Sequence, residues 1–154
     1  MRAEPALRLR DQERELVLAE LETIREASSS PVYRKRVERL LRAAREGALD
    51  DELASELERI LELALQSGRI RAVYGPGGEQ AALKLYRRTP GGADVVTSAA
   101  EVSEALTALA GKPLESVDVA VVGPGAYRLS LSAGGLELSV RLDRQGARLA
   151  SVGA

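Results

Sequence analysis

The sequence predicts an α+β protein in which an N-terminal three-helix segment is followed by a β-hairpin, one helix and a four-stranded antiparallel meander. Apolar residues recur with the helical period of 3.6 over residues 1–68 and alternate with period two over much of the remainder. Gly, Pro and Ser occupy the breaks between these segments. We therefore expect a helical segment over residues 1–68 and an antiparallel sheet domain with one covering helix over residues 69–154.

Three helices are expected in the N-terminal segment. The first runs from Leu9 to Ala27, the second begins at Pro31 after an N-cap at Ser30 and ends at Gly47, and the third follows Asp50 and ends at Gly68. The loop between the second and third helices is so short that these two should form an antiparallel hairpin. The expected buried positions lie on one stripe of each helix: Leu16, Val17, Leu21 and Ile24; Tyr33, Val37, Leu40, Leu41 and Ala44; Leu53, Leu57, Ile60, Leu61 and Ala64.

A β-hairpin is predicted over residues 69–88. The runs 69–74 and 79–88 flank Gly-Pro-Gly-Gly, which is typical of a hairpin loop. Pairing residue 74 with residue 79 places Ile70 opposite Leu83, so that apolar side chains share one face. Residues 89–92, Thr-Pro-Gly-Gly, then form a loop.

A helix over residues 98–110 and a meander complete the chain. Ser98 and Glu101 have the spacing of a capping box. The register of the first two strands follows from a three-residue loop at 123–125, because a shift by one residue would set an apolar position against Arg128. The expected pairs are Val121–Tyr127, Val119–Leu129 and Val117–Leu131. The helix should cover the apolar face and bury Val119, Leu129, Leu138 and Val140.

The chain contains no histidine and no cysteine, which excludes several classes of catalytic and metal-binding site. Catalytic triads with His or Cys, zinc sites and thiol redox chemistry all require one of these residues. The remaining Asp, Glu, Lys, Tyr and Ser residues form no recognisable catalytic motif in the sequence. We therefore expect no enzyme activity, no catalytic residues, no metal site and no cofactor.

Charge and hydropathy limit the possible partners. The net charge is −1, so no global attraction to nucleic acid or to an anionic membrane is expected. No stretch approaches the length of a membrane span, and residues 1–5 lack the layout of an export signal. These features predict a cytoplasmic protein that does not bind membranes.

The outward face of the predicted hairpin is the first candidate site. It collects Arg69, Arg71, Lys84, Tyr86 and Arg88, and the expected register sets Arg69 opposite Lys84. Like charges in such a position are unfavourable unless an anion neutralises them, which suggests an acidic protein partner. The competing interpretation is a sheet edge that uses cations to repel other strands.

Helix 31–46 carries the alternative site, for a polyanion. Lys35, Arg39 and Arg42 share one of its faces. Helix 51–66 is correspondingly acidic, and ion pairs within the chain explain the same cations without any ligand.

Three hypotheses about function follow, in this order. The first is a non-enzymatic protein-interaction or assembly protein, with self-association into a homo-oligomer as the simplest case. The second is a protein that binds nucleic acid or another polyanion through helix 31–46 or the basic hairpin face. The third is a small-ligand binder, or an enzyme that uses neither His nor Cys.

Overall fold

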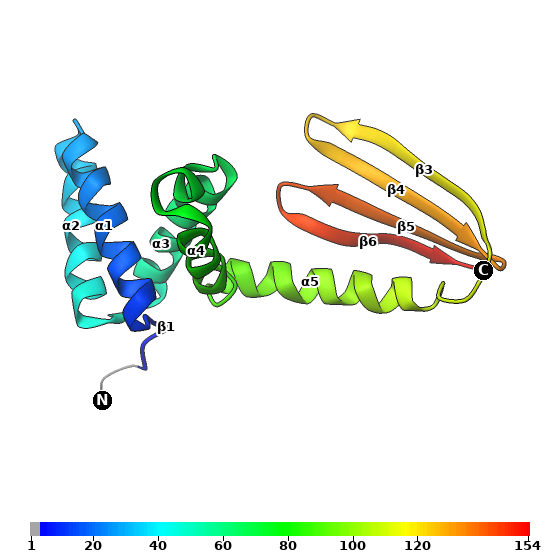
Figure 1. Ribbon diagram of the computed structural model, residues 1–154, viewed down its shortest axis with the longest axis horizontal. Coiled ribbons are helices and arrows are strands. Elements are labelled where there is room, and N and C mark those ends of the chain that lie inside the picture. The colour runs from blue at the N-terminus through cyan, green and yellow to red at the C-terminus, as the bar shows by residue number, and fades with distance from the viewer. Residues whose placement is uncertain (1–3) are drawn as a thin grey trace. The chain divides into compact units, whose positions relative to one another are not determined.

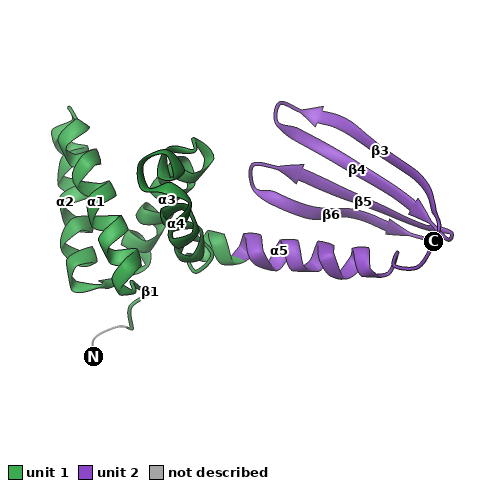
Figure 2. Cartoon of the chain, in the orientation of Figure 1, with its two compact units in different colours: residues 1–93 green, residues 94–154 purple. Residues whose placement is uncertain are grey.

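The computed structural model describes residues 4–154 and confirms the α+β class (Figure 1). Helices lie in the N-terminal part, and a four-stranded antiparallel meander ends the chain. The chain divides into two compact units, residues 1–93 and 94–154 (Figure 2). The sequence placed this division between residues 68 and 69. The difference arises because residues 69–86 are helical and pack against the preceding helix.

The first three helices have nearly the bounds expected from the sequence. They are α1 (Asp11–Ala27), α2 (Pro31–Glu46) and α3 (Asp51–Gln66). The Ser30 side chain accepts a hydrogen bond from the Tyr33 N–H at 3.3 Å, and Asp50 accepts one from the Leu53 N–H at 2.9 Å, so both N-caps are confirmed. Each helix turns its apolar stripe into one core that contains, among others, Leu21, Leu40, Leu41, Leu57 and Leu61.

The pairing of the helices differs from the expectation. α1 packs mainly against α2, and α3 mainly against helix α4 (Arg69–Tyr86), so α2 and α3 are not the principal antiparallel pair. Two short strands that the sequence pattern did not indicate, β1 (Leu7–Arg8) and β2 (Ala48–Leu49), pair antiparallel. This pairing brings Leu7 and Leu49 into the core of unit 1.

The predicted hairpin over residues 69–88 is wrong, because this segment is α4. Apolar residues alternate in this segment as they do in a strand, but the residue types themselves favour a helix. Residues 79–85, for example, are Glu-Gln-Ala-Ala-Leu-Lys-Leu. The buried residues of α4 are Ile70, Ala82 and Leu85. Gly75 interrupts the helix with a φ of 71°, a conformation that glycine adopts without strain, and Pro76 then begins the second helical piece.

Helix α5 (Pro90–Thr107) begins at Pro90 and not at Ser98. Residues 89–92, expected as a loop, are its N-cap and first turn. The buried Thr89 hydroxyl donates to the Tyr86 carbonyl at 2.7 Å and accepts from the Gly92 N–H at 3.2 Å. A Cβ atom at Gly92 would lie 1.7 Å from the Tyr86 oxygen, so this close approach requires glycine.

The sheet of unit 2 consists of β3 (Leu114–Gly123), β4 (Ala126–Ala133), β5 (Leu136–Asp143) and β6 (Gly146–Gly153), in that order. The predicted register of β3 and β4 is confirmed, with Val121, Val119 and Val117 opposite Tyr127, Leu129 and Leu131. At the β5–β6 turn, the Asp143 carboxylate accepts from Arg141 at 2.9 Å and from Arg148 at 2.8 Å. The hydrogen bond from Arg141 is the main reason that the pKa of Asp143 lies below its usual value.

Helix α5 covers only part of the apolar face of the sheet. Val102 packs with Leu138 and Val140, which are buried as expected, and Leu129 is partly buried in the same cluster. The expectation that this helix also buries Val119 is wrong, because 61% of Val119 is exposed. A helix is about 10 Å wide, whereas strands about 4.8 Å apart make a four-stranded sheet about 14 Å across before side chains are counted. One helix therefore leaves the β3 side uncovered.

Leu138 and Val152 provide a matched test of this arrangement. They lie opposite each other on β5 and β6, but Leu138 is 4% exposed and Val152 is 64% exposed. Leu138→Asp should abolish cooperative unfolding of the sheet, because it places a charge in the core, whereas Val152→Asp should change stability little. Amide hydrogen exchange of the strand residues during denaturation measures both effects. Equal protection in the two variants would contradict the observed facing of the sheet.

Candidate functional site

The five residues of the first candidate site do not form one surface. On a helix, residues two positions apart point in nearly opposite directions, so Arg69 and Arg71 diverge, as do Lys84 and Tyr86. Acidic groups of the chain itself pair with three of the cations. Arg69 pairs with Glu20, Arg71 with Glu79 and Arg88 with Glu13.

Lys84 and Tyr86 have separate surroundings. Lys84 is exposed, whereas Tyr86 packs against the core of unit 1. Burial, followed by the carboxylates of Glu62 and Glu58, raises the pKa of Tyr86. The like-charge contact between Arg69 and Lys84, on which the recognition hypothesis rested, does not occur because residues 69–86 form no hairpin.

The polyanion candidate on α2 is partly neutralised. Arg39 forms an ion pair with Glu52 of α3 at 3.4 Å, as the intramolecular interpretation expects, while Lys35 and Arg42 are exposed. Arg45 pairs with Glu22 of α1 at 3.3 Å. The acidic side chains of two neighbouring helices therefore already balance part of the positive charge of α2.

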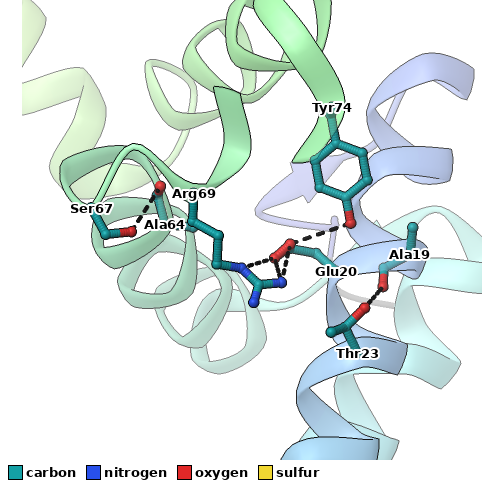
Figure 3. A network of polar contacts seen from close by, with 7 residues as sticks. All are labelled: Ala19, Glu20, Thr23, Ala64, Ser67, Arg69 and Tyr74. Carbon is teal, nitrogen blue, oxygen red and sulfur yellow. Dashed lines mark hydrogen bonds and ion pairs between the residues drawn. The ribbon is translucent and has the colours of Figure 1, made fainter. Parts of the chain in front are cut away.

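A buried carboxylate that the sequence analysis did not single out lies between α1 and α4 (Figure 3). The Glu20 side chain is 3% exposed and receives hydrogen bonds from the Arg69 guanidinium and from the Tyr74 hydroxyl, the latter at 3.3 Å. Glu13, one heptad earlier on α1, is also buried and accepts from the Arg10 N–H at 2.8 Å. Both glutamates fall on the apolar stripe of α1, and this interruption of the stripe is the signal that could have found them.

The Glu20 carboxylate is one wall of a groove of about 340 Å³, whose other lining residues include Ile24, Tyr33, Ile60 and Leu63. Arg69 and Tyr74 together satisfy both carboxylate oxygens. The arrangement is that of an ion pair that joins two helices. Within residues 4–154, no group of three or more acidic side chains is placed to hold a metal ion.

Part of the apolar face of the sheet is exposed. Val117, Val119 and Val121 of β3 point to the apolar face of the sheet and are 52%, 61% and 73% exposed. Tyr127 of β4 continues this patch at 44% exposure. We call Val117, Val119, Val121 and Tyr127 the β3 patch. A contiguous apolar patch on a folded unit is typical of a surface that binds another molecule.

The opposite face of the sheet is polar. The register places Arg128 opposite Arg141 and Arg141 opposite Arg148, so three arginines form a row across three strands. Asp143 pairs with both Arg141 and Arg148. The spacing of these arginines in the sequence does not by itself indicate the row, which follows only from the pairing of the three strands.

Comparisons with protein-family models, with curated proteins and with solved structures found no significant match to this chain. None of the helices in residues 4–154 combines the length and the apolar character needed to cross a membrane.

The Glu20–Arg69 ion pair makes a testable contribution to stability. Arg69→Met should destabilise unit 1 by about 3 kcal/mol, because it leaves the Glu20 carboxylate buried without its charged partner. Arg71→Met is the matched control, since the Arg71–Glu79 pair is exposed, and it should cost less than about 1 kcal/mol. Urea denaturation followed by helical circular dichroism compares them. Similar losses in both variants would show that the buried pair has no special role.

Tyr74 should make stability fall in alkaline solution. Burial, and then the charge and hydrogen bond of Glu20, raise the pKa of Tyr74 above its usual value of 10.0. A raised folded-state pKa contributes stability that is fully present below the unfolded pKa and is lost as pH rises through the folded pKa. Tyr74→Phe should therefore lose less stability than the parent as the pH rises above 10.0. Urea denaturation at a series of alkaline pH values tests this, and parallel curves would refute it.

Proposed function

We propose that this chain is a non-enzymatic protein-interaction or assembly protein that binds another polypeptide through the β3 patch. The observation that carries the proposal is the exposure of Val117, Val119 and Val121 on the face of the sheet that α5 covers only around Leu138 and Val140. Burying a valine side chain contributes on the order of 1.5 kcal/mol, so covering three valines and a tyrosine is a substantial driving force for association.

The chemistry of the patch favours a protein partner over a polyanion. β3 contains no Lys or Arg, and its charged residues are the carboxylates Glu115 and Asp118. Phosphate groups would be repelled by such a strand, whereas a protein surface can supply both apolar side chains and backbone hydrogen bonds. An open strand edge beside an apolar stripe is the arrangement used in β-strand addition.

The test compares the parent chain with Val119→Lys and with the control Val152→Lys. Val152 is a valine on the same face, 64% exposed, but on β6 at the other edge of the sheet. We expect the parent and the control to bind a protein, either a second copy or a partner captured from nuclease-treated lysate of the source organism. Val119→Lys should lose that binding while remaining folded, as judged by its circular dichroism spectrum.

Each captured protein is then purified and titrated against the three chains by calorimetry, and the solution mass of each chain is measured in parallel. A partner that binds the parent and Val152→Lys at least about tenfold more tightly than Val119→Lys supports the proposal. The proposal is overturned if the parent binds no protein and does not self-associate, or if binding survives in Val119→Lys.

A further inference from the structure

The outer edge of β3 is open for pairing with another strand. In the sheet of residues 114–153, β3 is hydrogen-bonded to β4 alone, so the N–H and C=O groups on its other side face away from the sheet. Natural proteins protect such edges with lysines, prolines, bulges or a covering element. The ten residues of β3 include no Lys, Arg or Pro, and its charged residues are Glu115 and Asp118. Its register with β4 shifts near both ends but is regular over residues 116–121.

The other edge of the sheet is protected better. β6 carries Arg148, and its register with β5 shifts between Ser139 and Val140, which disturbs a straight run of backbone groups. In Figure 1, β3 and β6 are the two outer strands of the meander. Of these two strands, β3 therefore offers the longer regular edge, residues 116–121 against residues 146–149 of β6.

We propose that the partner at this edge is a second copy of the chain, and that the two β3 strands pair antiparallel about Val119. This inference rests on the proposed function and names its partner. Val119 then lies opposite the partner's Val119, and Val117 lies opposite the partner's Val121. Residues directly opposite in an antiparallel pair point to the same face, so the two β3 patches join into one apolar strip.

The sequence of β3 selects this register over its neighbours. A register centred on Asp118 would set two carboxylates opposite each other, which is unfavourable. A register centred on Ala120 would pair Val117 with Gly123, beyond the regular part of the strand. The register centred on Val119 makes three apolar pairs within the regular stretch and places Asp118 opposite the uncharged Ala120.

The resulting assembly is closed. Two four-stranded sheets become one sheet of eight strands with a twofold axis at Val119, and the identical β3 edges satisfy each other. The edges that remain are the two β6 strands, each with Arg148 and a shifted register. Growth by further edge pairing is therefore opposed, and a dimer is the expected end point.

Solution mass tests the partner. Sedimentation equilibrium of the full chain should give twice the 16.4 kDa monomer mass for the parent and for Val152→Lys. Val119→Lys should raise the dimer dissociation constant at least about tenfold, because it places two ammonium groups opposite each other on the twofold axis. Circular dichroism and the melting temperature of dilute samples establish that the variant remains folded.

Single cysteines test the register. The chain has no cysteine, so an introduced thiol can cross-link only to its own copy. Val119→Cys brings two thiols opposite each other, with Cα atoms about 4.5–5.5 Å apart, within reach of a disulfide. In the controls Asp118→Cys and Ala120→Cys, the equivalent Cα atoms are offset by two residues and lie about 8 Å apart, outside that reach. Oxidation at micromolar protein concentration should yield a covalent dimer with Val119→Cys alone.

The outcomes separate this inference from the proposed function. A monomeric parent throughout the micromolar range overturns the self-pairing, and so does a dimer that dissociates in Val152→Lys but not in Val119→Lys. Equal cross-linking at positions 118, 119 and 120 overturns the register. If the parent is monomeric but binds a different protein that Val119→Lys fails to bind, the proposed function stands and only the second copy is refuted.

Discussion

Helix α5 is narrower than the four-stranded sheet, and this difference in width determines which apolar residues of unit 2 are exposed. All four strands turn apolar residues to the same face, and these residues form three rows that run across the sheet. α5 packs its own apolar side chains, Val102 among them, over the β5 side of this surface. The valines of β3 are left outside the contact. These valines are exposed because one helix is too narrow to cover four strands, and not because the alternation of apolar residues along β3 is interrupted.

Unit 1 is joined by a different kind of contact. Its core is aliphatic, with leucines from α1, α2 and α3 at its centre, yet two carboxylates of α1 are buried beside it. Each carboxylate has an arginine from the region of α4, Arg69 for Glu20 and Arg88 for Glu13. These pairs lie at the beginning and just beyond the end of α4, so they favour one position of that helix on α1. Apolar packing alone, being non-directional, would specify this position less strictly.

The sequence was sufficient where periodicity and turn chemistry agreed. The N-caps Ser30 and Asp50, the stripe of α2 and the register of β3 against β4 all follow from residue spacing. It failed over residues 69–88, where a period of two occurred in a segment of Ala, Leu, Glu and Lys that packs as a helix. That error placed the five residues of the first candidate site on one face of a hairpin that does not form. The apolar row Val117, Val119 and Val121 was recognised, but how much of it one helix covers depends on three-dimensional packing that no local pattern encodes.

Gly92 sets a limit on how this chain can change by mutation. The Tyr86 carbonyl occupies the space that any Cβ at position 92 would need, and the same carbonyl accepts the Thr89 hydroxyl. By contrast, a Cβ atom at Gly77 would meet nothing within 4 Å. Sequences that drift freely at position 77 should therefore retain glycine at position 92. A survey of random variants that remain folded would then show many residue types at position 77 and glycine alone at position 92.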